Sequence, residues 1–301
     1  MLRSFEEIYK VVTEAGTRKK IALAAAHDLD ALTSAANARK IGLADFILIG
    51  NVDEIKKILT DMGENLEDYE YIQTNSDTES ANTAAQLVAE KKADAPMKGI
   101  LHTSVFLKGM LNSQLGLVDK KALISQATVL YFEKENRMMM ITDCAINIAP
   151  TFEEKMKITQ NAVDFARKMQ IDTPKVAIVT PLEEVKNSIP STVEAAMLSK
   201  AADRKQIKNC IVDGPLALDN ALSLEAAKHK KIESPVAGQA DILVMPDLNA
   251  GNILDKSLRF FADYRTAGVV LGAKCPLVMT SRSDSAANKL NSIACAMLQT
   301  L

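Results

Sequence analysis

Four consecutive residues near the end of the chain, Ser281-Arg-Ser-Asp284, combine side chains that could bind an anion and react with it. They follow the apolar run from Pro276 to Thr280 and precede a stretch with apolar residues at helical spacing. A helix N-terminus attracts anions because its first N–H groups have no partner within the helix, and the planar guanidinium of Arg282 matches phosphate or carboxylate. The segment therefore predicts an anion site. A purely structural interpretation stays open, in which Arg282 pairs with Asp284 and Ser283 caps the helix.

Other polar and glycine clusters stand where predicted strands end. Open α/β sheets bind ligands along the carboxyl edge of their strands, so these clusters are candidate binding loops. In one of them Gly251 permits close backbone approach, Asn252 could cap a second helix, and Lys256 follows one turn later. Each cluster taken singly also fits an ordinary turn, but together they favour a phosphate-bearing ligand. The clusters are 97–99 with 102–104, 143–147, 213–219, 250–252 and 281–284.

Motifs for several other chemistries are missing from the sequence. The 12 glycines form no G-x-G pair, and the stretch nearest to a P-loop, Gly268 to Lys274, has the wrong spacing, which argues against dinucleotide and Walker-type nucleotide sites. There is no H-E-x-x-H and no G-x-S-x-G, and we interpret the 3 histidines as structural or exposed. The 4 cysteines form no C-x-x-C pair, so we interpret them as structural rather than as zinc ligands or nucleophiles.

The composition is typical of a globular protein with small-molecule ligands. The length of 301 residues suggests two domains, at about 150 residues each, and a content of 48% hydrophobic and 25% charged residues argues against disorder. The formal charge of −2 offers no basic excess for binding nucleic acid. No apolar run approaches the roughly 18 residues of a membrane span, no secretion signal is visible, and dispersed cysteines suit a reducing compartment. We expect a cytoplasmic protein without a membrane or nucleic-acid partner.

Short apolar runs alternate with amphipathic stretches, which indicates β-α units on mainly parallel sheets. Strands are expected at 20–26, 46–49, 70–73, 176–179, 210–212, 242–245, 269–271 and 277–280. Helices are expected at 28–40, 53–62 and 77–92 with N-caps Asp28, Asp53 and Asp77, after Pro150, and at 284–298. In the middle of the chain, the apolar runs 128–132 and 138–142 flank a polar segment, which indicates a hairpin or a domain crossover.

These segments resemble the phosphate acetyl/butyryl transferase family, most closely its phosphate butyryltransferase branch, over nearly the whole chain. The resemblance is carried by the ordered motifs 97–99, 143–150, 174–177, 213–221, 234–241, 246–252 and 280–284. It implies exchange of an acyl group between coenzyme A and inorganic phosphate, with coenzyme A as a substrate and with no permanently bound cofactor or metal. It also implies a homo-oligomer built from dimers.

The family's fold supplies the expected domain organisation. The resemblance implies two α/β domains with mainly parallel sheets and a cleft between them, similar to isocitrate and isopropylmalate dehydrogenases. In such a fold the last helix returns to the first domain. We therefore expect a first domain of residues 1–137 plus 284–301 and a second domain of residues 138–283.

The resemblance also implies roles for individual residues. Ser281 and Arg282 match the serine and arginine that hold the reacting carbonyl and phosphate. In the acetyl branch an aspartate seven residues after that serine deprotonates the thiol, but here Asn288 stands in its place. Asp284 lies four residues earlier, on the same helical face if the helix has begun, and is the candidate base. The candidates for substrate binding are Lys98, Thr103, Ser104, Lys108, Asp143, Asn147, Asp213, Gly251, Asn252, Lys256 and Asn288.

Three alternatives to butyryl transfer remain at this stage. The first is phosphate acetyltransferase activity, because one methylene gives only about 1 to 3 kcal/mol of discrimination and the sequence does not determine the acyl chain length. The second is an oxidoreductase of the isocitrate-dehydrogenase type, which would need a cofactor loop and a cluster of acids for a divalent metal. The third is a non-catalytic sensor of acyl-CoA or acyl phosphate, suggested by Asn288 and by Lys108 and Val118, where relatives often carry arginine.

Overall fold

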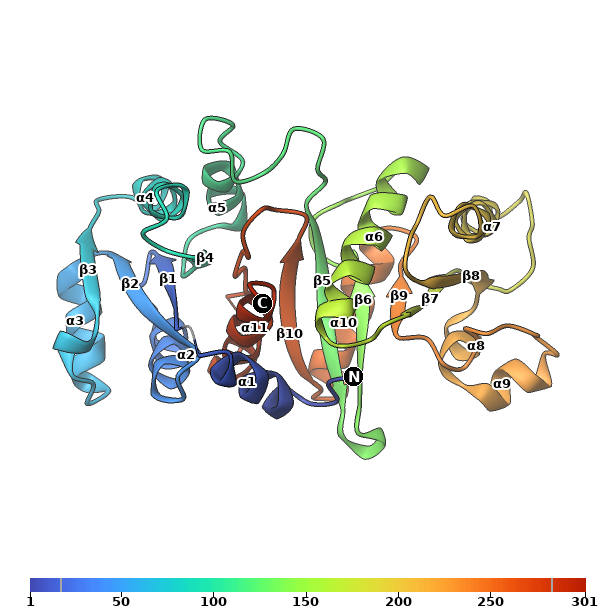
Figure 1. Ribbon diagram of the computed structural model, residues 1–301, viewed down its shortest axis with the longest axis horizontal. Coiled ribbons are helices and arrows are strands. Elements are labelled where there is room, and N and C mark those ends of the chain that lie inside the picture. Colours follow the sequence, from blue (N-terminus) through green and yellow to red (C-terminus); the bar gives the residue numbers. More distant parts are fainter. Residues whose placement is uncertain (17, 283) are drawn as a thin grey trace. The chain divides into compact units, whose positions relative to one another are not determined.

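The computed structural model describes residues 1–16, 18–282 and 284–301. The chain divides into two compact units, which we call unit A (Phe5–Ala122 with Ala267–Leu301) and unit B (Met1–Ser4 with Leu123–Thr266). Two sheets of mainly parallel strands, flanked by helices, confirm the predicted α/β class (Figure 1). The units divide at other residues than the domains expected at 1–137 plus 284–301 and at 138–283, an assignment that stays a prediction.

Unit A holds a four-stranded parallel sheet in the order β3-β2-β1-β4. Its strands are β1 (Lys19–Ala24), β2 (Ala44–Gly50), β3 (Glu70–Gln73) and β4 (Ala95–Lys98). The chain adds β2 and β3 on one side of β1 and then returns to add β4 on the other side, so the direction of winding changes between β1 and β4. The carboxyl ends of two such strands are where open α/β sheets bind ligands.

The helices of unit A show how far acidic residues predict helix starts. They are α1 (Phe5–Glu14), α2 (Leu29–Lys40), α3 (Val52–Asp61), α4 (Asp77–Ala89), α5 (Thr103–Met110) and α11 (Ala286–Leu298), with a 3-10 turn at Leu66–Asp68. Asp28 caps α2 as predicted, accepting from the Ala31 N–H at 2.8 Å. Asp53 and Asp77 are wrong as caps, because Asn51 caps α3 and Ser76 caps α4. The two aspartates lie in first turns, where the helix dipole also favours acidic side chains.

Residues 277–280 do not form the expected strand. Leu277 makes an isolated bridge to Val270, and Val278 makes one to Met97 of β4. The Lys98 N–H donates to the Val278 carbonyl at 2.9 Å, and the Val278 N–H donates to the Pro96 carbonyl at 3.0 Å. This short parallel pairing brings the segment that follows, 281–284, to the carboxyl end of β4.

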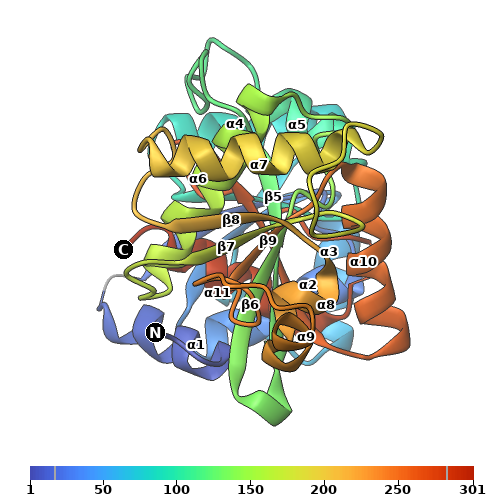
Figure 2. The same cartoon turned by 90° about the vertical axis from the view of Figure 1, so that its right-hand side faces the viewer.

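The second sheet runs in the order β10-β5-β6-β9-β7-β8. β5 and β6 form an antiparallel hairpin, which decides between the two predicted possibilities, and β6, β9, β7 and β8 pair in parallel. In Figure 2, α7 lies on one face of this sheet and α8 and α9 lie on the other. The strands are β5 (Ser125–Phe132), β6 (Arg137–Thr142), β7 (Lys175–Val179), β8 (Ile211–Leu216), β9 (Ile242–Val244) and β10 (Arg265–Leu271), which spans a point where the units divide. The helices are α6 (Phe152–Lys168), α7 (Pro190–Asp203), α8 (Leu218–Leu222), α9 (Leu224–His229) and α10 (Leu248–Phe261), with a 3-10 turn at Glu133–Glu135.

Small side chains let α11 lie against the rest of unit A. Ala31, Ala35 and Ala38 of α2 recur at helical spacing and are fully buried, and α2 packs on α11. Alanine permits close approach of two helices because its side chain ends at Cβ. The packing fixes which face of α11 points inward, and that face carries polar as well as apolar residues.

Within the described residues, no helix is long and apolar enough to cross a membrane.

Candidate active site

Lys98 ends β4 and is held at the change of winding direction in unit A. Its side chain is only 2% exposed, and its Nζ donates to the carbonyls of Gly99 at 3.0 Å and Leu101 at 3.3 Å. A Cβ on Gly99 would lie 2.1 Å from the Ala25 carbonyl oxygen and 2.7 Å from that of Ala24. Only glycine therefore lets the loop after β4 pack directly on the end of β1, and this packing fixes the lysine beside the sheet edge.

The predicted anion segment forms a closed turn at the same edge. Asp284 is 6% exposed, and its Oδ2 accepts a hydrogen bond from the Ser281 N–H at 2.8 Å. The Asp284 carbonyl accepts a hydrogen bond from Nζ of Lys289 on α11. Arg282, between the two ends of the turn, is exposed, and the predicted cap Ser283 lies outside the described residues. The turn is thus held through Asp284 at both its side chain and its backbone.

The start of α11 differs from what the sequence suggested. The helix begins at Ala286, with Ser285 as its cap accepting from the Asn288 N–H at 3.3 Å. Asp284 therefore precedes the helix, and helical spacing does not place it beside Asn288. Any role for Asp284 as a base has to rest on the turn that it closes rather than on a shared helical face.

Two cationic side chains, Arg282 and Lys289, act on the buried ammonium group of Lys98 at this edge. The pKa of Lys98 is lowered to about 8, first because burial disfavours the charged form and then because of the positive charges of Arg282 and Lys289. Asp28 and Asp284 oppose this shift but do not cancel it. The local field is therefore positive, and a bound anion would stabilise the protonated lysine. Local charge of this kind can recruit anions although the whole chain carries a net charge of −2.

Lys289 was missed by sequence reasoning. It is 3% exposed, and it shares the inward face of α11 with Ile293 and Ala296, four and seven residues later, which are 0% and 1% exposed. A lysine in register with core positions of an amphipathic helix is the signal that could have identified it.

The remaining unit A candidates lie on α5. Thr103 and Ser104 open this helix, and Lys108 lies in its last turn; all three side chains are exposed. His102, at the N-cap position, makes no side-chain cap hydrogen bond in the described structure. The first turn of α5 therefore offers exposed hydroxyl groups at a helix start.

In unit B, Asp143 organises the loop after β6. Its carboxylate accepts hydrogen bonds from the N–H groups of Ala145 at 2.8 Å, Ile146 at 3.0 Å, Asn147 at 3.3 Å and Gln126 at 3.3 Å, and from Nδ2 of Asn147 at 2.6 Å. Such saturation makes Asp143 a structural centre of the loop. The two predicted binding residues, Asp143 and Asn147, are thus hydrogen-bonded to one another. Asn147 also donates to the Ile124 carbonyl at 2.9 Å.

The predicted second helix start is placed differently. α10 begins at Leu248 and is capped by Asp247, which accepts from the Ala250 N–H at 3.0 Å, so Asn252 is wrong as a cap. Asn252 instead donates from Nδ2 to the Cys144 carbonyl at 3.1 Å. The close approach predicted at Gly251 is confirmed, but its partner is protein: a Cβ there would lie 2.2 Å from the Asp143 carbonyl oxygen.

Two more of the predicted binding residues lie in unit B. Lys256 follows on α10 and is half-buried. Asp213 lies within β8 rather than after it, and its Oδ1 accepts from the Gly214 N–H at 2.8 Å. Unit B thus brings Asp143, Asn147, Gly251 and Asn252 together around one loop.

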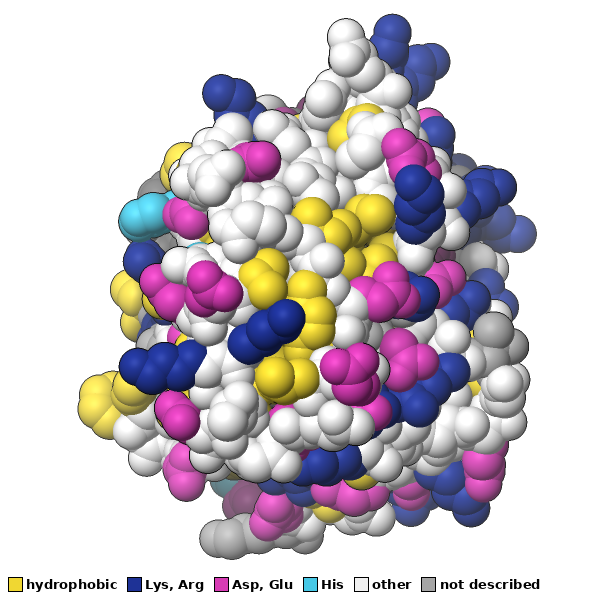
Figure 3. Space-filling model, turned by 90° about the vertical axis from the view of Figure 1, so that its left-hand side faces the viewer, with side chains coloured by type: hydrophobic (Ala, Val, Ile, Leu, Met, Phe, Trp, Pro, Cys, Tyr) yellow, Lys and Arg dark blue, Asp and Glu magenta, His cyan; other side chains and the backbone are white. Residues whose placement is uncertain are grey.

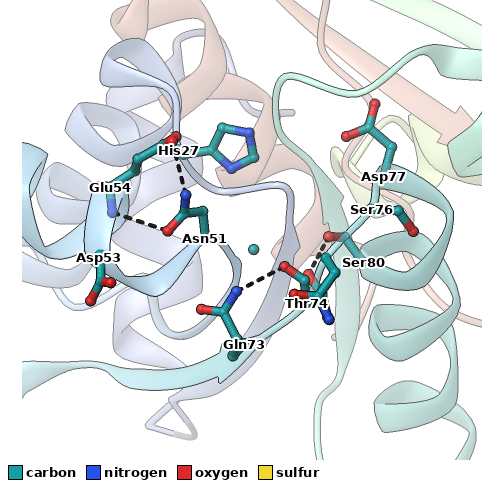
Figure 4. Close-up of a pocket in the computed structure, with 11 residues that line it drawn as sticks. His27, Asn51, Asp53, Glu54, Gln73, Thr74, Ser76, Asp77 and Ser80 are labelled. Carbon is teal, nitrogen blue, oxygen red and sulfur yellow. Dashed lines mark hydrogen bonds between the residues drawn. The ribbon is translucent and has the colours of Figure 1, made fainter.

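A cavity of about 450 Å³ lies at the carboxyl ends of β1 to β3 in unit A. Figure 4 shows the carboxylates of Asp53, Glu54 and Asp77 around it, with His27 near Asn51. No lysine or arginine is among its described lining residues, so it is a poor place for a phosphate. The same sheet edge is therefore acidic beyond β1 and cationic at β4. The lining residues are His27, Gly50, Asn51, Asp53, Glu54, Gln73, Thr74, Asn75, Ser76, Asp77 and Ser80.

The face of the molecule shown in Figure 3 carries no large patch of like charge. Acidic and basic side chains are interspersed there, and hydrophobic side chains gather near the centre. On this face, attraction of an anion cannot come from a broad basic field, so the cations at β4 are the better candidates.

Comparison with known proteins assigns the chain to a family. A sequence model described as "Phosphate acetyl/butaryl transferase" matches residues 68–297. The chain is 43% identical over 298 residues to phosphate butyryltransferase of Clostridium acetobutylicum, covering 99% of this chain and 98% of that protein. A branched-chain phosphotransacylase from Enterococcus faecalis superposes with a TM-score of 0.81 at 33% identity, covering 93% of this chain and 98% of that one.

A dehydrogenase shares the fold more distantly. A 4-hydroxythreonine-4-phosphate dehydrogenase from Klebsiella pneumoniae superposes with a TM-score of 0.56 at 14% identity, covering 93% of this chain and 98% of that one. This likeness concerns the fold alone and gives the expected dehydrogenase-like arrangement only weak support. Matched by the family model over most of its length and by a relative along nearly all of it, the chain belongs to the phosphate acetyl/butyryl transferase family and is an acyltransferase.

Proposed function

We propose that this enzyme exchanges a short-chain acyl group between coenzyme A and inorganic phosphate, with butyryl as the preferred group: butyryl-CoA and phosphate give butyryl phosphate and coenzyme A. The observation that carries the proposal is that two buried lysines, Lys98 and Lys289, lie beside the turn 281–284 at the β4 end of unit A. We further propose that it works in the cytoplasm as a homo-oligomer built from dimers, with coenzyme A as a substrate and no cofactor kept bound.

The chemistry is described most simply from acyl phosphate to acyl-CoA. The coenzyme A thiol gives its proton to a base, the sulfur forms a bond to the acyl carbon, and an oxyanion develops on the carbonyl oxygen. The bond from the acyl carbon to the phosphate oxygen then breaks, and phosphate leaves with the electron pair. A thiol with a reference pKa of about 8.5 needs only about 2 kcal/mol to ionise at pH 7, so a cationic field and a modest base suffice.

Three residues of the turn have roles in this proposal. Arg282 binds the phosphoryl group with its planar fork, which suits an exposed side chain that meets the ligand from the solvent side. The Ser281 hydroxyl donates a hydrogen bond to the developing oxyanion. Asp284 takes the thiol proton and, through its hydrogen bond from the Ser281 N–H, keeps the two residues in register.

The other candidates act at the ends of the substrates. Thr103, Ser104 and Lys108 offer hydroxyl and ammonium groups to a phosphate, and Asn288 offers an amide at the start of α11. In unit B, Asp143, Asn147, Gly251 and Asn252 shape the loop after β6. Lys256 and Asp213 stay proposed contacts to coenzyme A, and the cleft between two domains stays a prediction.

The test is an assay for thiol release. Purified protein is mixed with butyryl-CoA, and coenzyme A is followed with and without inorganic phosphate. We expect release that depends on phosphate and is faster with butyryl-CoA than with acetyl-CoA. Absence of phosphate-dependent release with every acyl-CoA from acetyl to branched five-carbon groups would overturn the proposal.

The alternatives predict other outcomes of the same experiment. A phosphate acetyltransferase, which the family description also covers, would turn over acetyl-CoA fastest. A sensor would bind acyl-CoA or acyl phosphate without turnover. An oxidoreductase would reduce NAD in the presence of a divalent metal, and we do not favour it because the dehydrogenase likeness is one of fold alone.

A further inference from the structure

The inward face of α11 buries three polar side chains in its first two turns. Lys289, Asn291 and Ser292 are 3%, 1% and 1% exposed. Asn291 accepts a hydrogen bond from the Tyr9 hydroxyl, and Ser292 accepts one from the Gly268 N–H at 2.9 Å. These two residues therefore join α11 to neighbouring segments of unit A, as buried polar groups ordinarily do.

Lys289 is satisfied much less completely. An ammonium group has three donors, and within the described residues that of Lys289 has one acceptor, the Asp284 carbonyl. Lys98 has two acceptors there, the carbonyls of Gly99 and Leu101. Three of the six N–H donors on these two buried lysines thus have no acceptor in the part of the chain that the structure describes.

The unmet donors and the charges call for the same kind of ligand. Burying an ammonium group without full hydrogen bonding is unfavourable, and here the positive charges of Arg282 and Lys289 act on Lys98 as well. Asp28 and Asp284 are the acids that act on Lys98, and Asp284 already accepts from the Ser281 N–H. An oxyanion with several acceptor oxygens would satisfy both the donors and the charge.

We propose that Lys289 and Lys98 are direct ligands of the phosphoryl oxygens of inorganic phosphate and acyl phosphate, with exposed Arg282 supplying the outer cation. This assignment rests on the proposed function for the identity of the ligand. It makes Lys289 a binding residue as well as a brace for the turn, because the same ammonium group that holds the Asp284 carbonyl faces the anion.

The test measures binding of inorganic phosphate to the full chain by calorimetry, without coenzyme A. Lys289→Gln keeps an N–H donor for the Asp284 carbonyl but loses the charge, and we expect roughly 10- to 100-fold weaker phosphate binding, the usual loss for a hydrogen bond to a charged group. Lys98→Gln should weaken binding to a similar extent. Lys155→Gln is the matched control, since Lys155 is also buried, at 5% exposure, but pairs with Glu194 in unit B.

A purely structural lysine would behave differently. If Lys289 only braces the turn, Lys289→Gln binds phosphate like the wild type and the proposal is overturned. In turnover assays the proposal predicts a raised KM for phosphate with an unchanged KM for coenzyme A, whereas loosening of the turn as a whole would lower kcat. Phosphate binding that depends on Lys289 in a protein without turnover would support this inference while overturning the proposed function. Turnover with an unchanged phosphate KM in Lys289→Gln would support the proposed function while overturning this inference.

A measurement on the wild type covers the case in which the variant does not fold. A crystal soaked in tungstate locates the oxyanion by its anomalous scattering. We expect the anion with oxygens about 3 Å from Nζ of both lysines, within hydrogen-bond range. An anion bound elsewhere on unit A, or no bound anion at concentrations that inhibit turnover, would overturn the assignment.

Discussion

The carboxylate of Asp284 accepts a hydrogen bond from the backbone N–H of Ser281 at 2.8 Å. The candidate base and the candidate oxyanion donor are therefore parts of one turn, and the carbonyl of the same aspartate is held by Lys289. A substitution in this turn can act on chemistry, on geometry or on anion binding. Predictions for the site have to separate these three effects.

Replacement of Asp284 by asparagine separates the base from the turn. The amide oxygen can still accept from the Ser281 N–H, so the turn should persist, but the amide cannot take up the thiol proton. We expect kcat to fall about 100-fold or more, the usual contribution of a general base, with little change in phosphate binding. Steady-state kinetics combined with calorimetry measure both, and a near-normal kcat would remove Asp284 from the chemistry.

Replacement of Arg282 tests the outer cation. Arg282→Ala should lower turnover by orders of magnitude, and Arg282→Lys should restore part of it, because lysine keeps the charge but not the planar fork. Stability should barely change in either variant, since the side chain is exposed. Arg204→Ala, at an exposed arginine after α7, is the control. Activity of Arg282→Ala equal to that of the control would show that the guanidinium does not contact the reacting groups.

We predict that the carboxylate of Asp143 contributes mainly to the stability of the fold rather than to substrate binding. Removing it in Asp143→Ala leaves several backbone N–H groups of its loop without an acceptor, and we expect the free energy of unfolding to drop by about 3 kcal/mol. Asp143→Asn keeps one acceptor oxygen and should lose less. Thermal unfolding midpoints rank the variants. A raised KM for acyl-CoA at unchanged unfolding midpoint would instead make Asp143 a direct ligand.

Anion binding should depend on pH through Lys98. Its pKa is lowered to about 8 by burial and by Arg282 and Lys289, against Asp28 and Asp284. Because the protonated form binds the anion, binding should be strong below pH 8 and weaken as pH rises through that value.

Sulfate is the suitable probe for this titration, since its own charge is constant between pH 7 and 9. Its inhibition constant against phosphate should rise across pH 8 in the wild type. Lys98→Arg, which stays protonated, should show a flat profile over the same range. A wild-type profile that is equally flat would contradict the role given to Lys98.

The same titration has a consequence for stability. A lysine whose pKa is lower in the folded chain binds fewer protons there than in the unfolded chain between about pH 8 and its ordinary value of 10.5. Lys98 therefore lowers the free energy of unfolding most below pH 8, and this destabilisation decreases as pH rises above 8. Phosphate should offset this penalty below pH 8, where it pairs with the charged lysine.

Local patterns in the sequence were enough to predict the class of fold and to select the segment proposed to bind an anion. Alternating apolar runs and amphipathic stretches identify β-α units, and Asp28 can be recognised as a cap, because periodicity and capping depend on neighbours a few residues away. The Ser281-to-Asp284 segment could be selected because an arginine just before a helix start suits an anion. The motifs that carry the family resemblance likewise need no tertiary structure.

Tertiary structure alone decided which partner each of these side chains meets. In the sequence Lys289 is an ordinary helical lysine, and only the packing of α2 on α11 shows that it points inward. Asp143 was predicted to bind substrate, but its carboxylate accepts hydrogen bonds from the backbone N–H groups of its own loop. Gly251 indicates a close approach in the sequence, but only the fold shows that protein backbone is what approaches. The physical reason is that residue type sets what a side chain can bind, whereas its partner is set by contacts between segments far apart in the chain.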